Sequence, residues 1–281
     1  QDMFGSNQQN IPSLASVAQK VARQEGKKLD MKQFIAYEII ACSFLFGLIE
    51  SSGESSMLFD IDDSQRATLT QRLRARAGQE QLVMFLTGFA GAGKSTCVKV
   101  AQRFCFEFCR AASIPWDENT FLFTATTGSA ASLFGGQTIH DAAFLNGNER
   151  NISNKKRQEW QSVRMLIIDE ISFFTRTNLE KLDRRLKNIM GCQDLPYGGV
   201  SVVFSGDFHQ LRPVRCESQG VLYEGVMNGL FEGSINTAIM LEDTHRFDED
   251  PVFGEILKRL WRGELTEEDV EFAATSSYAG G

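Results

Sequence analysis

The chain lacks an excess of positive charge, a cysteine pair with metal-ligand spacing, and an uninterrupted apolar run as long as a bilayer is thick. Its formal net charge is −7, so any contact with nucleic acid needs a local basic surface. The six cysteines form no CxxC pair, which favours free thiols in a reducing compartment. The longest apolar stretch, residues 34–49, is interrupted by Glu38 and predicts a buried helix instead of a membrane span.

A glycine-rich segment, residues 88–96, is the most informative stretch of the sequence. An apolar run with the length of a buried strand precedes it, and apolar residues follow it with helical spacing. A strand, a glycine-rich loop and a helix form the context of a phosphate-binding P-loop, where backbone N–H groups converge on phosphate. The residues expected to bind a nucleotide are Gly88, Gly91, Ala92, Gly93, Lys94, Ser95 and Thr96.

Side-chain chemistry gives individual roles to residues in and beyond this segment. Lys94 can reach the β- and γ-phosphates, and the Ser95 hydroxyl can ligate Mg²⁺. A second apolar run, residues 166–168, ends in Asp169 and Glu170. Asp169 can hold Mg²⁺ opposite Ser95, while Glu170 can act as the base that orients or deprotonates water. These residues predict a magnesium-assisted nucleotide site.

A third apolar run leads into a segment that contains His209 and Gln210. The amide of Gln210 can donate to a phosphate and accept from water at once, so it is a candidate sensor of the γ-phosphate. Hydrogen bonding within the loop is the alternative for Gln210. For His209 a surface or packed position in the loop is the favoured interpretation.

Strands and helices alternate from residue 81 onward. The predicted strands are residues 82–86, 121–125, 165–168, 200–204 and 238–241. The predicted helices are residues 94–111, 127–134, 175–190 and 220–232. This alternation predicts an α/β fold, in which a parallel sheet carries helices on both faces and the ligand lies at the carboxyl ends of the strands.

The N-terminal part of the chain, up to residue 80, predicts helices and polar segments without strands. Residues 1–28 are a polar lead-in, either a loosely held helix or a disordered arm, and a strong helix follows from Leu29 to about Glu50. Asp30 and Gln33 have the spacing of a capping box, while reading of an adenine base is the alternative for Gln33. Residues 66–80 predict a basic helix with a solvated face, or alternatively a contact with nucleic acid or a partner.

Five sequence blocks occur in this order along the chain: GFAGAGKST, FTATTGSAASLFGGQTIH, LIIDEIS, SVVFSGDFHQLRPV and LEDTHRFDEDPVFGEILKRLWRGELTEEDV. Together they resemble the blocks of superfamily-one, 5′-to-3′ DNA helicases of the petite-integration-frequency (PIF) type. Gly198-Gly199, Arg246-Phe247 and the spacer before the P-loop are most similar to the Helitron-transposon branch.

This resemblance implies a RecA-like P-loop NTPase that uses ATP and Mg²⁺ and binds single-stranded DNA. It implies an N-terminal helical segment at residues 29–80 and the first RecA-like motor domain at residues 81–281, with the second motor domain absent from this chain. It also implies an intracellular location, nuclear in a eukaryote, no membrane partner, and settings such as DNA repair, DNA recombination and telomere maintenance.

The resemblance also assigns residues. It makes Gln33 part of the adenine-recognising Q motif and directs Arg246 at the γ-phosphate, with a surface salt bridge as the alternative for Arg246. The expected contacts to single-stranded DNA are Thr126, Ser129, Thr138 and His140. Helix capping by Thr127, Ser129 and Thr138 is an equally supported interpretation.

Two departures from the family pattern affect the expected function. Arg212 stands where the family usually has proline, which predicts a more mobile loop or an extra charge facing DNA. Without a second motor domain, ATP would meet only one wall of its cleft, so we expect binding to survive and hydrolysis to be weak. The alternatives are a P-loop kinase or regulatory NTPase, and an accessory module that binds nucleotide or DNA without hydrolysis.

Overall fold

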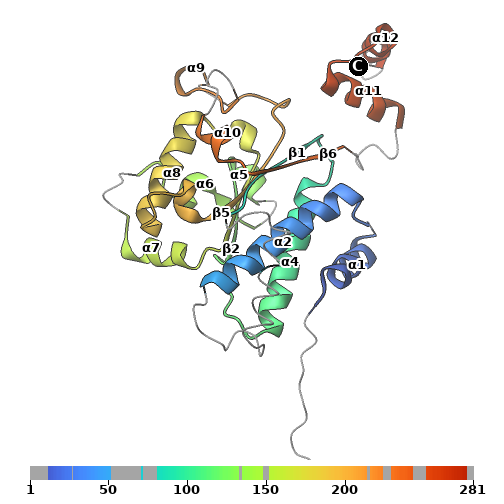
Figure 1. The fold of residues 1–281 in the computed structure, drawn as a ribbon. Helices are drawn as coiled ribbons and strands as arrows, with labels where there is room; N and C mark the ends of the chain where they lie inside the picture. The colour runs from blue at the N-terminus through green and yellow to red at the C-terminus, as the bar shows by residue number, and fades with distance from the viewer. Residues whose placement is uncertain are drawn as a thin grey trace, which may run out of the picture.

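The computed structural model describes residues 12–26, 28–51, 71, 81–132, 135–147, 152–213, 216–223, 229–242 and 251–276. Within these ranges six strands form one parallel sheet in the order β3-β2-β4-β5-β1-β6 (Figure 1). The strands are β1 Val83–Gly88, β2 Phe121–Ala125, β3 Gln137–Thr138, β4 Met165–Asp169, β5 Ser201–Ser205 and β6 Thr237–Leu241. Strand β5 therefore lies between β1, which leads into the glycine-rich segment, and β4, which ends in the acidic pair.

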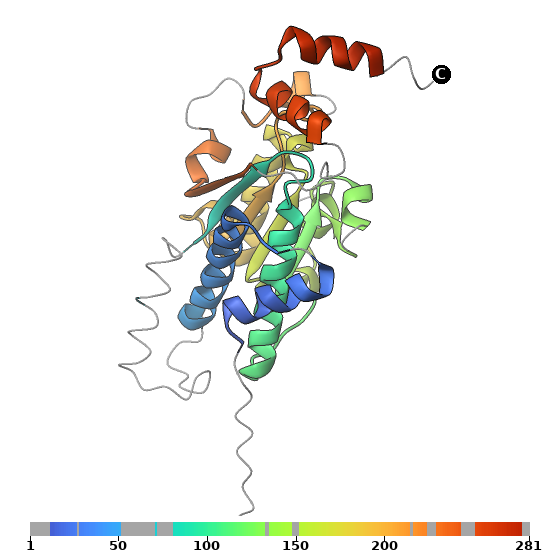
Figure 2. The ribbon, with the colours of Figure 1, turned by 90° about the vertical axis from the view of Figure 1, so that its right-hand side faces the viewer.

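Helices cover both faces of the sheet, which confirms the predicted α/β class (Figures 1 and 2). In β4, Met165 and Ile167 belong to one core while Leu166 and Ile168 belong to the other, because side chains alternate along a strand. The helices of the first face are α1 Leu14–Glu25, α2 Met31–Ser51 and α4 Lys94–Ala111. The helices of the second face are α6 Ile139–Ala142, α7 Asn154–Gln161, α8 Arg176–Met190 and α10 Leu230–Ser234.

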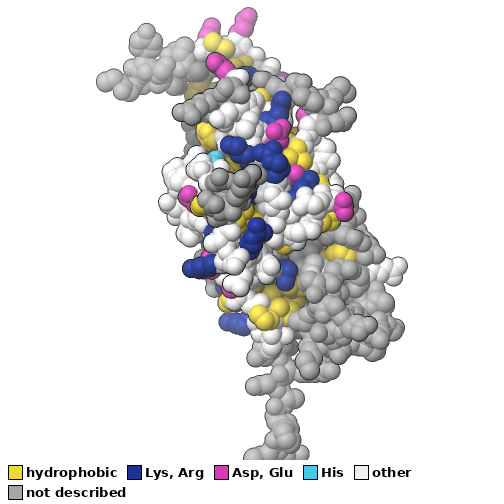
Figure 3. Space-filling view, turned by 90° about the vertical axis from the view of Figure 1, so that its left-hand side faces the viewer, with side chains coloured by type: hydrophobic (Ala, Val, Ile, Leu, Met, Phe, Trp, Pro, Cys, Tyr) yellow, Lys and Arg dark blue, Asp and Glu magenta, His cyan; other side chains and the backbone are white. Residues whose placement is uncertain are grey.

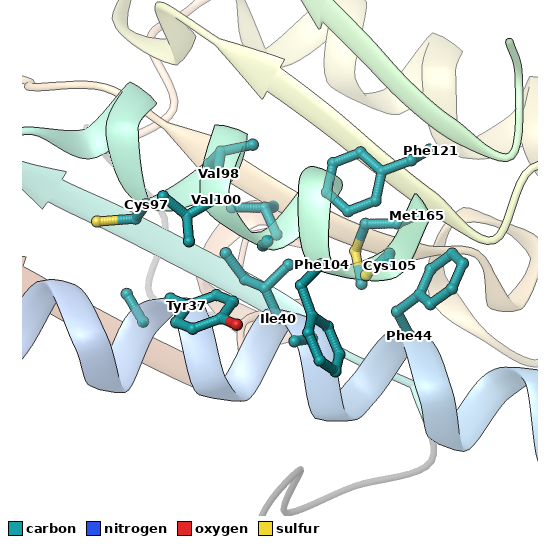
Figure 4. Packing of buried hydrophobic residues seen from close by; sticks show 14 of the residues in the cluster. Tyr37, Ile40, Phe44, Cys97, Val98, Val100, Phe104, Cys105, Phe121 and Met165 are labelled. Carbon is teal, nitrogen blue, oxygen red and sulfur yellow. The ribbon is translucent and has the colours of Figure 1, made fainter. Parts of the chain in front are cut away.

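The apolar helix expected at residues 34–49 is α2, a core helix of the first face. Figure 4 shows Tyr37, Ile40 and Phe44 of α2 next to Phe104 and Cys105 of α4. Among the described residues, one segment has the length and hydropathy of a membrane span, and it belongs to this same helix. Its side chains fill the core, so packing against α4 accounts for its apolar character.

Helix α1 packs against the same core more closely than a loose lead-in would. Val17 and Val21, four residues apart on one face of the helix, are almost fully buried. The Tyr37 hydroxyl donates to the backbone oxygen of Leu14 at 3.0 Å, which ties α1 to α2. Of the two expectations for this segment, the structure has the helix over Leu14–Glu25.

Most predicted elements are present within a residue or two of their predicted ends. The five predicted strands are β1, β2, β4, β5 and β6, and three predicted helices are α4, α5 (Gly128–Ser132) and α8. The helix predicted over residues 220–232 is wrong at residues 221–223, which are not helical, and α10 begins at Leu230. The short strand β3 and the polar helix α7 were not predicted.

Two helices that the alternation did not predict follow β6. They are α11 (Pro251–Arg262) and α12 (Glu267–Ser276), and Figures 1 and 2 place them outside the layered core. The Arg259 guanidinium donates to both carboxylate oxygens of Asp269 at 2.7 and 2.6 Å, which joins the two helices. The predicted basic helix at residues 66–80 lies almost wholly outside the described residues, because only residue 71 of it is described.

The described cysteines are free thiols, as the sequence predicts. Cys97, Cys105 and Cys109 are buried along α4, and burial raises the pKa of Cys97 to about 12 and that of Cys109 to about 11. No group of His, Cys, Asp or Glu with metal-binding geometry occurs in the part of the chain that the structure describes. The helical Cys105 and Cys109 therefore act as core residues.

Candidate nucleotide and DNA site

The glycine-rich segment forms a tight loop between β1 and α4. Gly88, Gly91 and Gly93 have positive φ angles of 144°, 86° and 81°, which a side chain would strain. A Cβ atom on Gly88 would also lie 2.3 Å from the backbone oxygen of Leu241 in β6. Because α4 begins at Lys94, the unpaired N–H groups of its first turn face this loop. The loop thus has the backbone form that phosphate binding requires.

Lys94 folds back over the loop that precedes it. Its Nζ donates to the backbone oxygens of Gly88 at 2.7 Å and Phe89 at 3.1 Å. Phosphate oxygens carry negative charge and are stronger acceptors than these carbonyls, so a bound phosphate would compete for the ammonium group. Ser95 and Thr96 lie in the first turn of α4, beside the same loop.

Gln33 is buried between the start of α2 and this loop, with 2% of its surface exposed. Its Oε1 accepts the backbone N–H of Asp30 at 3.0 Å, and the Asp30 carboxylate accepts the backbone N–H of Gln33 at 2.8 Å, which forms the predicted capping box. Its Nε2 donates to the backbone oxygen of Ala92 at 3.0 Å. Gln33 therefore connects the N-terminal helix to the loop, and reading of a base by Gln33 stays a prediction.

The two acids lie at the carboxyl end of β4, two strands from the glycine-rich loop. Asp169 is 7% exposed, and its Oδ1 accepts the Ser205 hydroxyl at 2.7 Å from the neighbouring strand β5. Glu170 has left-handed backbone angles of φ 56° and ψ 43°, which turn the chain away from the sheet. The side chain of Asp169 is thus fixed by a hydrogen bond, while Glu170 lies half-buried where the chain leaves the strand.

The carboxylate of Glu170 is suited to bind an additional ligand. Its Oε2 is buried and accepts no hydrogen bond among the described residues. Burial and then the charge of Asp169 raise its pKa, while the charge of Lys94 lowers it, so the acid pair and Lys94 share one electrostatic environment. A hydroxyl, a carboxylate and backbone N–H groups of this kind suit Mg²⁺ and phosphate, so the residues present fit such a group.

Gln210 lies on the turn that follows β5, between the loop and the acids. Its backbone N–H donates to the backbone oxygen of Asp207 at 3.1 Å, and its side chain is exposed. Asp207 is 3% exposed and anchors this turn. The carboxyl ends of β1, β5 and β4 thus bring together Lys94, the Gln210 turn and the acid pair.

Residues predicted to contact DNA lie at the same edge of the sheet, after β2 and β3. Thr126 donates its hydroxyl to the backbone oxygen of Glu170 at 2.7 Å, which ties this segment to the acid pair. The Thr138 hydroxyl accepts the backbone N–H of Asp141 at 3.2 Å and caps α6. Thr127 accepts the N–H of Ala130 at 3.3 Å. Capping is therefore present at Thr127 and Thr138, and DNA contacts by Thr126, Ser129 and Thr138 stay predictions.

His140 is half-buried on α6, next to α8. Its Nε2 lies 3.1 Å from the side-chain amide nitrogen of Asn178. Its ring packs edge-on against the Phe174 ring, with 5.6 Å between the two ring centroids. Burial lowers its pKa, and Lys181 acts in the same direction. An amide nitrogen can only donate, so Nε2 accepts from Asn178 in this contact, and DNA binding by His140 stays a prediction.

A local basic surface, which any contact with nucleic acid would need, lies on α7 and α8. Of the five Lys and Arg residues of α8, Arg185 is buried, so Arg176, Lys181, Arg184 and Lys187 form its basic surface. Figure 3 shows Lys and Arg side chains spread down this face of the molecule, with few acidic ones between them. This basic surface adjoins α6, because Asn178 of α8 contacts His140 of α6.

Arg246 and its neighbours, residues 243–250, lie outside the described residues, so the structure does not place the arginine expected at the γ-phosphate.

A sequence model of PIF1-like helicases matches residues 60–232, more than half of the chain. The chain belongs to the PIF1-like helicase family.

Curated PIF1-like relatives share about three in ten residues with it. The ATP-dependent DNA helicase RRM3 of Saccharomyces cerevisiae is 31% identical over 193 residues, which cover 65% of this chain and 25% of the relative. The ATP-dependent DNA helicase Pif1 of Bdellovibrio bacteriovorus is 32% identical over 201 residues, which cover 67% and 42%. The chain thus spans less than half the length of either relative.

Solved PIF1-like structures share its fold. The crystal structure of Pif1 helicase from Candida albicans has a TM-score of 0.57 and 28% identity, covering 75% of this chain and 46% of that one. Pif1 helicase from Bacteroides in complex with ADP-AlF3 and ssDNA has a TM-score of 0.56 and 26% identity, covering 72% and 47%. The RecA-like fold expected from the sequence is therefore confirmed.

Four residues of this PIF1-like site were not predicted from sequence. Ser205 fixes Asp169, Asn178 fixes His140, and Trp261 contacts Asp207, its Nε1 donating to that carboxylate at 3.0 Å. Ser205 and Asp207 could have been found, because Ser205 ends the strand next to the acid pair and Asp207 follows two residues later. Asn178 and Trp261 could not, since each acts across a contact between helices or loops that are distant in sequence.

Proposed function

We propose that this chain is the motor domain of an ATP-dependent 5′-to-3′ DNA helicase, which binds and hydrolyses MgATP and contacts single-stranded DNA. The observation that carries the proposal is the meeting of Lys94, the Gln210 turn and the acid pair at the ends of three adjacent strands. Membership of the PIF1-like helicase family supports it.

Each residue has a role that its chemistry supports. The P-loop N–H groups and Lys94 would hold the phosphates, with Ser95 and Asp169 as ligands of Mg²⁺, which when bound neutralises phosphate charge. Glu170 would orient and deprotonate water from its half-buried position, and Gln210 would contact the γ-phosphate. Arg246 would add positive charge to the same phosphate.

DNA would lie across the edge formed by Thr126, Ser129, Thr138 and His140. Thr126 is bonded to the backbone of Glu170, so movement of the acid pair on hydrolysis would reach the DNA contacts directly. The basic surface of α7 and α8 would draw the phosphate backbone toward this edge despite the net negative charge of the chain. A second motor domain would close the other side of the ATP cleft and make the step along DNA possible.

The test is the rate of ATP hydrolysis with and without single-stranded DNA, at two salt concentrations. It is measured on this chain, on a version extended at its C-terminus, and on Glu170→Gln in both. Glu118→Gln, an exposed acid before β2 and outside the basic surface, is the matched control. We expect DNA to stimulate the extended version, Glu170→Gln to bind MgATP without turnover, and the control to behave as the wild type.

Two results would overturn the proposal. One is the absence of magnesium-dependent ATP binding by the wild type in calorimetry. The other is an extended version whose hydrolysis is insensitive to DNA at both salt concentrations.

A further inference from the structure

Trp261 of α11 contacts both loops that surround the expected γ-phosphate position. Its ring centroid lies 4.6 Å from that of Phe89, in the P-loop, and 4.2 Å from that of His209, in the turn after β5. Its Nε1–H donates to Asp207 Oδ1 at 3.0 Å. One side chain from the C-terminal helices thus joins the P-loop to the turn that carries Gln210.

The hydrogen bond to Asp207 affects the position of Gln210. The same Oδ1 also accepts the backbone N–H of His209 at 2.9 Å and lies 3.1 Å from its Nδ1. The backbone oxygen of Asp207 accepts the N–H of Gln210 at 3.1 Å. Phe208, in the same turn, packs into the core, and its ring centroid lies 5.2 Å from that of Phe85. This contact also holds the turn in place. The carboxylate of Asp207 is therefore the point at which Trp261 can hold or release the Gln210 turn.

The contact with Phe89 depends on the state of the P-loop. Lys94 Nζ donates to the backbone oxygen of Phe89 at 3.1 Å, so the peptide next to the Phe89 ring is held by the ammonium group that a phosphate would attract. When Lys94 turns to a phosphate, this hydrogen bond is lost, and the backbone oxygen of Phe89 keeps only the N–H of Ala92, at 3.1 Å. The Phe89 backbone is then held by one hydrogen bond instead of two, so a change in its position would also shift the ring that packs on Trp261.

Space for a response exists beside Trp261. A cavity of about 380 Å³ lies between α11 and the two loops, and Phe89, Asp207, His209, Leu257 and Trp261 line it. The indole thus has room to change its position against the loops. A shift of α11 would pass to α12 through the paired hydrogen bonds between Arg259 and Asp269.

We propose that Trp261 is a positioning residue. It couples phosphate binding by the P-loop to the position of the Gln210 turn, and it passes changes in either loop to helix α11. The inference rests on the proposed function, because it assumes that the P-loop binds a nucleoside triphosphate. Trp261 acts through Asp207 and Phe89 and does not itself touch the nucleotide. Its effect should therefore depend on whether the γ-phosphate position is filled.

The experiment compares binding of MgADP with binding of MgADP–aluminium fluoride, which fills the γ-phosphate position, by calorimetry on the full chain. Trp261→Leu removes both the stack and the N–H donor, whereas Trp261→Phe keeps the stack. Trp116→Phe is the matched control, since Trp116 packs on Phe44 and Phe106 away from both loops. Urea denaturation of each variant shows that it is folded.

We expect Trp261→Leu to bind MgADP–aluminium fluoride about tenfold more weakly while its affinity for MgADP stays within about twofold. Trp261→Phe should lose less, and the control should lose nothing. Gln210→Ala should show the same selective loss, and adding Trp261→Leu to it should have little further effect, because both act on one contact. A merely structural role would weaken both ligands together.

Tryptophan fluorescence gives a second readout. MgADP–aluminium fluoride should change the emission of the wild type and of Trp116→Phe, and leave that of Trp261→Phe unchanged. Equal loss for both ligands, or full affinity of Trp261→Leu for both, would overturn the inference while the proposed function stands. If the wild type binds neither ligand, the proposed function fails first, and the inference fails with it.

Discussion

Replacing Gln33 with alanine removes the two hydrogen bonds that its side chain makes. The backbone oxygen of Ala92 loses the amide donor at 3.0 Å, and the backbone N–H of Asp30 loses its acceptor at 3.0 Å. The Ala92 residue is fully buried, so water cannot readily replace the lost donor. Asp30 still caps the N–H of residue 33, because that bond involves only the backbone of Gln33.

The size of the effect follows from these contacts. A typical hydrogen bond contributes about 1 kcal/mol, and a buried group left without a partner costs about 1–3 kcal/mol. We therefore expect Gln33→Ala to lower the free energy of unfolding by about 2–4 kcal/mol without any ligand. Gln33→Glu keeps an acceptor for Asp30 but lacks the amide donor and places a buried carboxylate against the oxygen of Ala92, so it should lose at least as much.

Urea denaturation, monitored by circular dichroism, measures the loss of unfolding free energy in both variants. The loss appears as a lower urea concentration at the midpoint, with an unchanged m-value. Gln158→Ala, which changes an exposed glutamine in α7, should stay within about 0.5 kcal/mol of the wild type. If Gln33→Ala is as stable as this control, the link between α2 and the P-loop is refuted. The role of Gln33 would then be confined to contact with the base.

Three further predictions concern the P-loop and the C-terminal helices. Gly88→Ala should lower the free energy of unfolding by at least about 2 kcal/mol in the same urea assay, because its Cβ would lie 2.3 Å from the backbone oxygen of Leu241. Gly47→Ala is the control and should not destabilise the protein, because a Cβ there has no atom within 4 Å. Lys94→Ala should weaken MgADP binding by roughly a hundredfold in calorimetry, while Lys99→Ala on the exposed side of α4 should not. Hydrogen bonds from Arg259 and from the backbone of Thr266 hold the pKa of Asp269 well below its usual range. The stabilisation from this pair is therefore complete above about pH 4 and falls as the pH drops toward the lowered pKa. Asp269→Asn at pH 7 should accelerate hydrogen exchange in α12, and unchanged exchange relative to Glu267→Gln would contradict this.

The sequence by itself determined five of the described strands and the residues at the carboxyl ends of β1, β4 and β5. Apolar runs with β-strand length end at Gly88, Asp169 and Ser205, and the carboxyl ends of parallel strands share one edge, so the P-loop and the acids had to come together. Helices α4 and α8 were predictable because their apolar spacing is regular and their ends carry clear local signals. Thr175 caps α8 through the N–H of Asn178, and Gly191 ends it in the left-handed conformation.

Only the tertiary structure decided the contacts that connect this edge to the rest of the molecule. The two-residue strand β3 exists because Thr124 and Ala125 of β2 offer an edge to pair with, which no local pattern of Gln137 and Thr138 encodes. Gln33 meets Ala92 across 59 residues of chain, and Trp261 meets Asp207 across 54. Local propensity fixes helices and strands over a few residues, whereas the choice among such distant partners depends on how whole layers pack and which buried polar groups then need a partner.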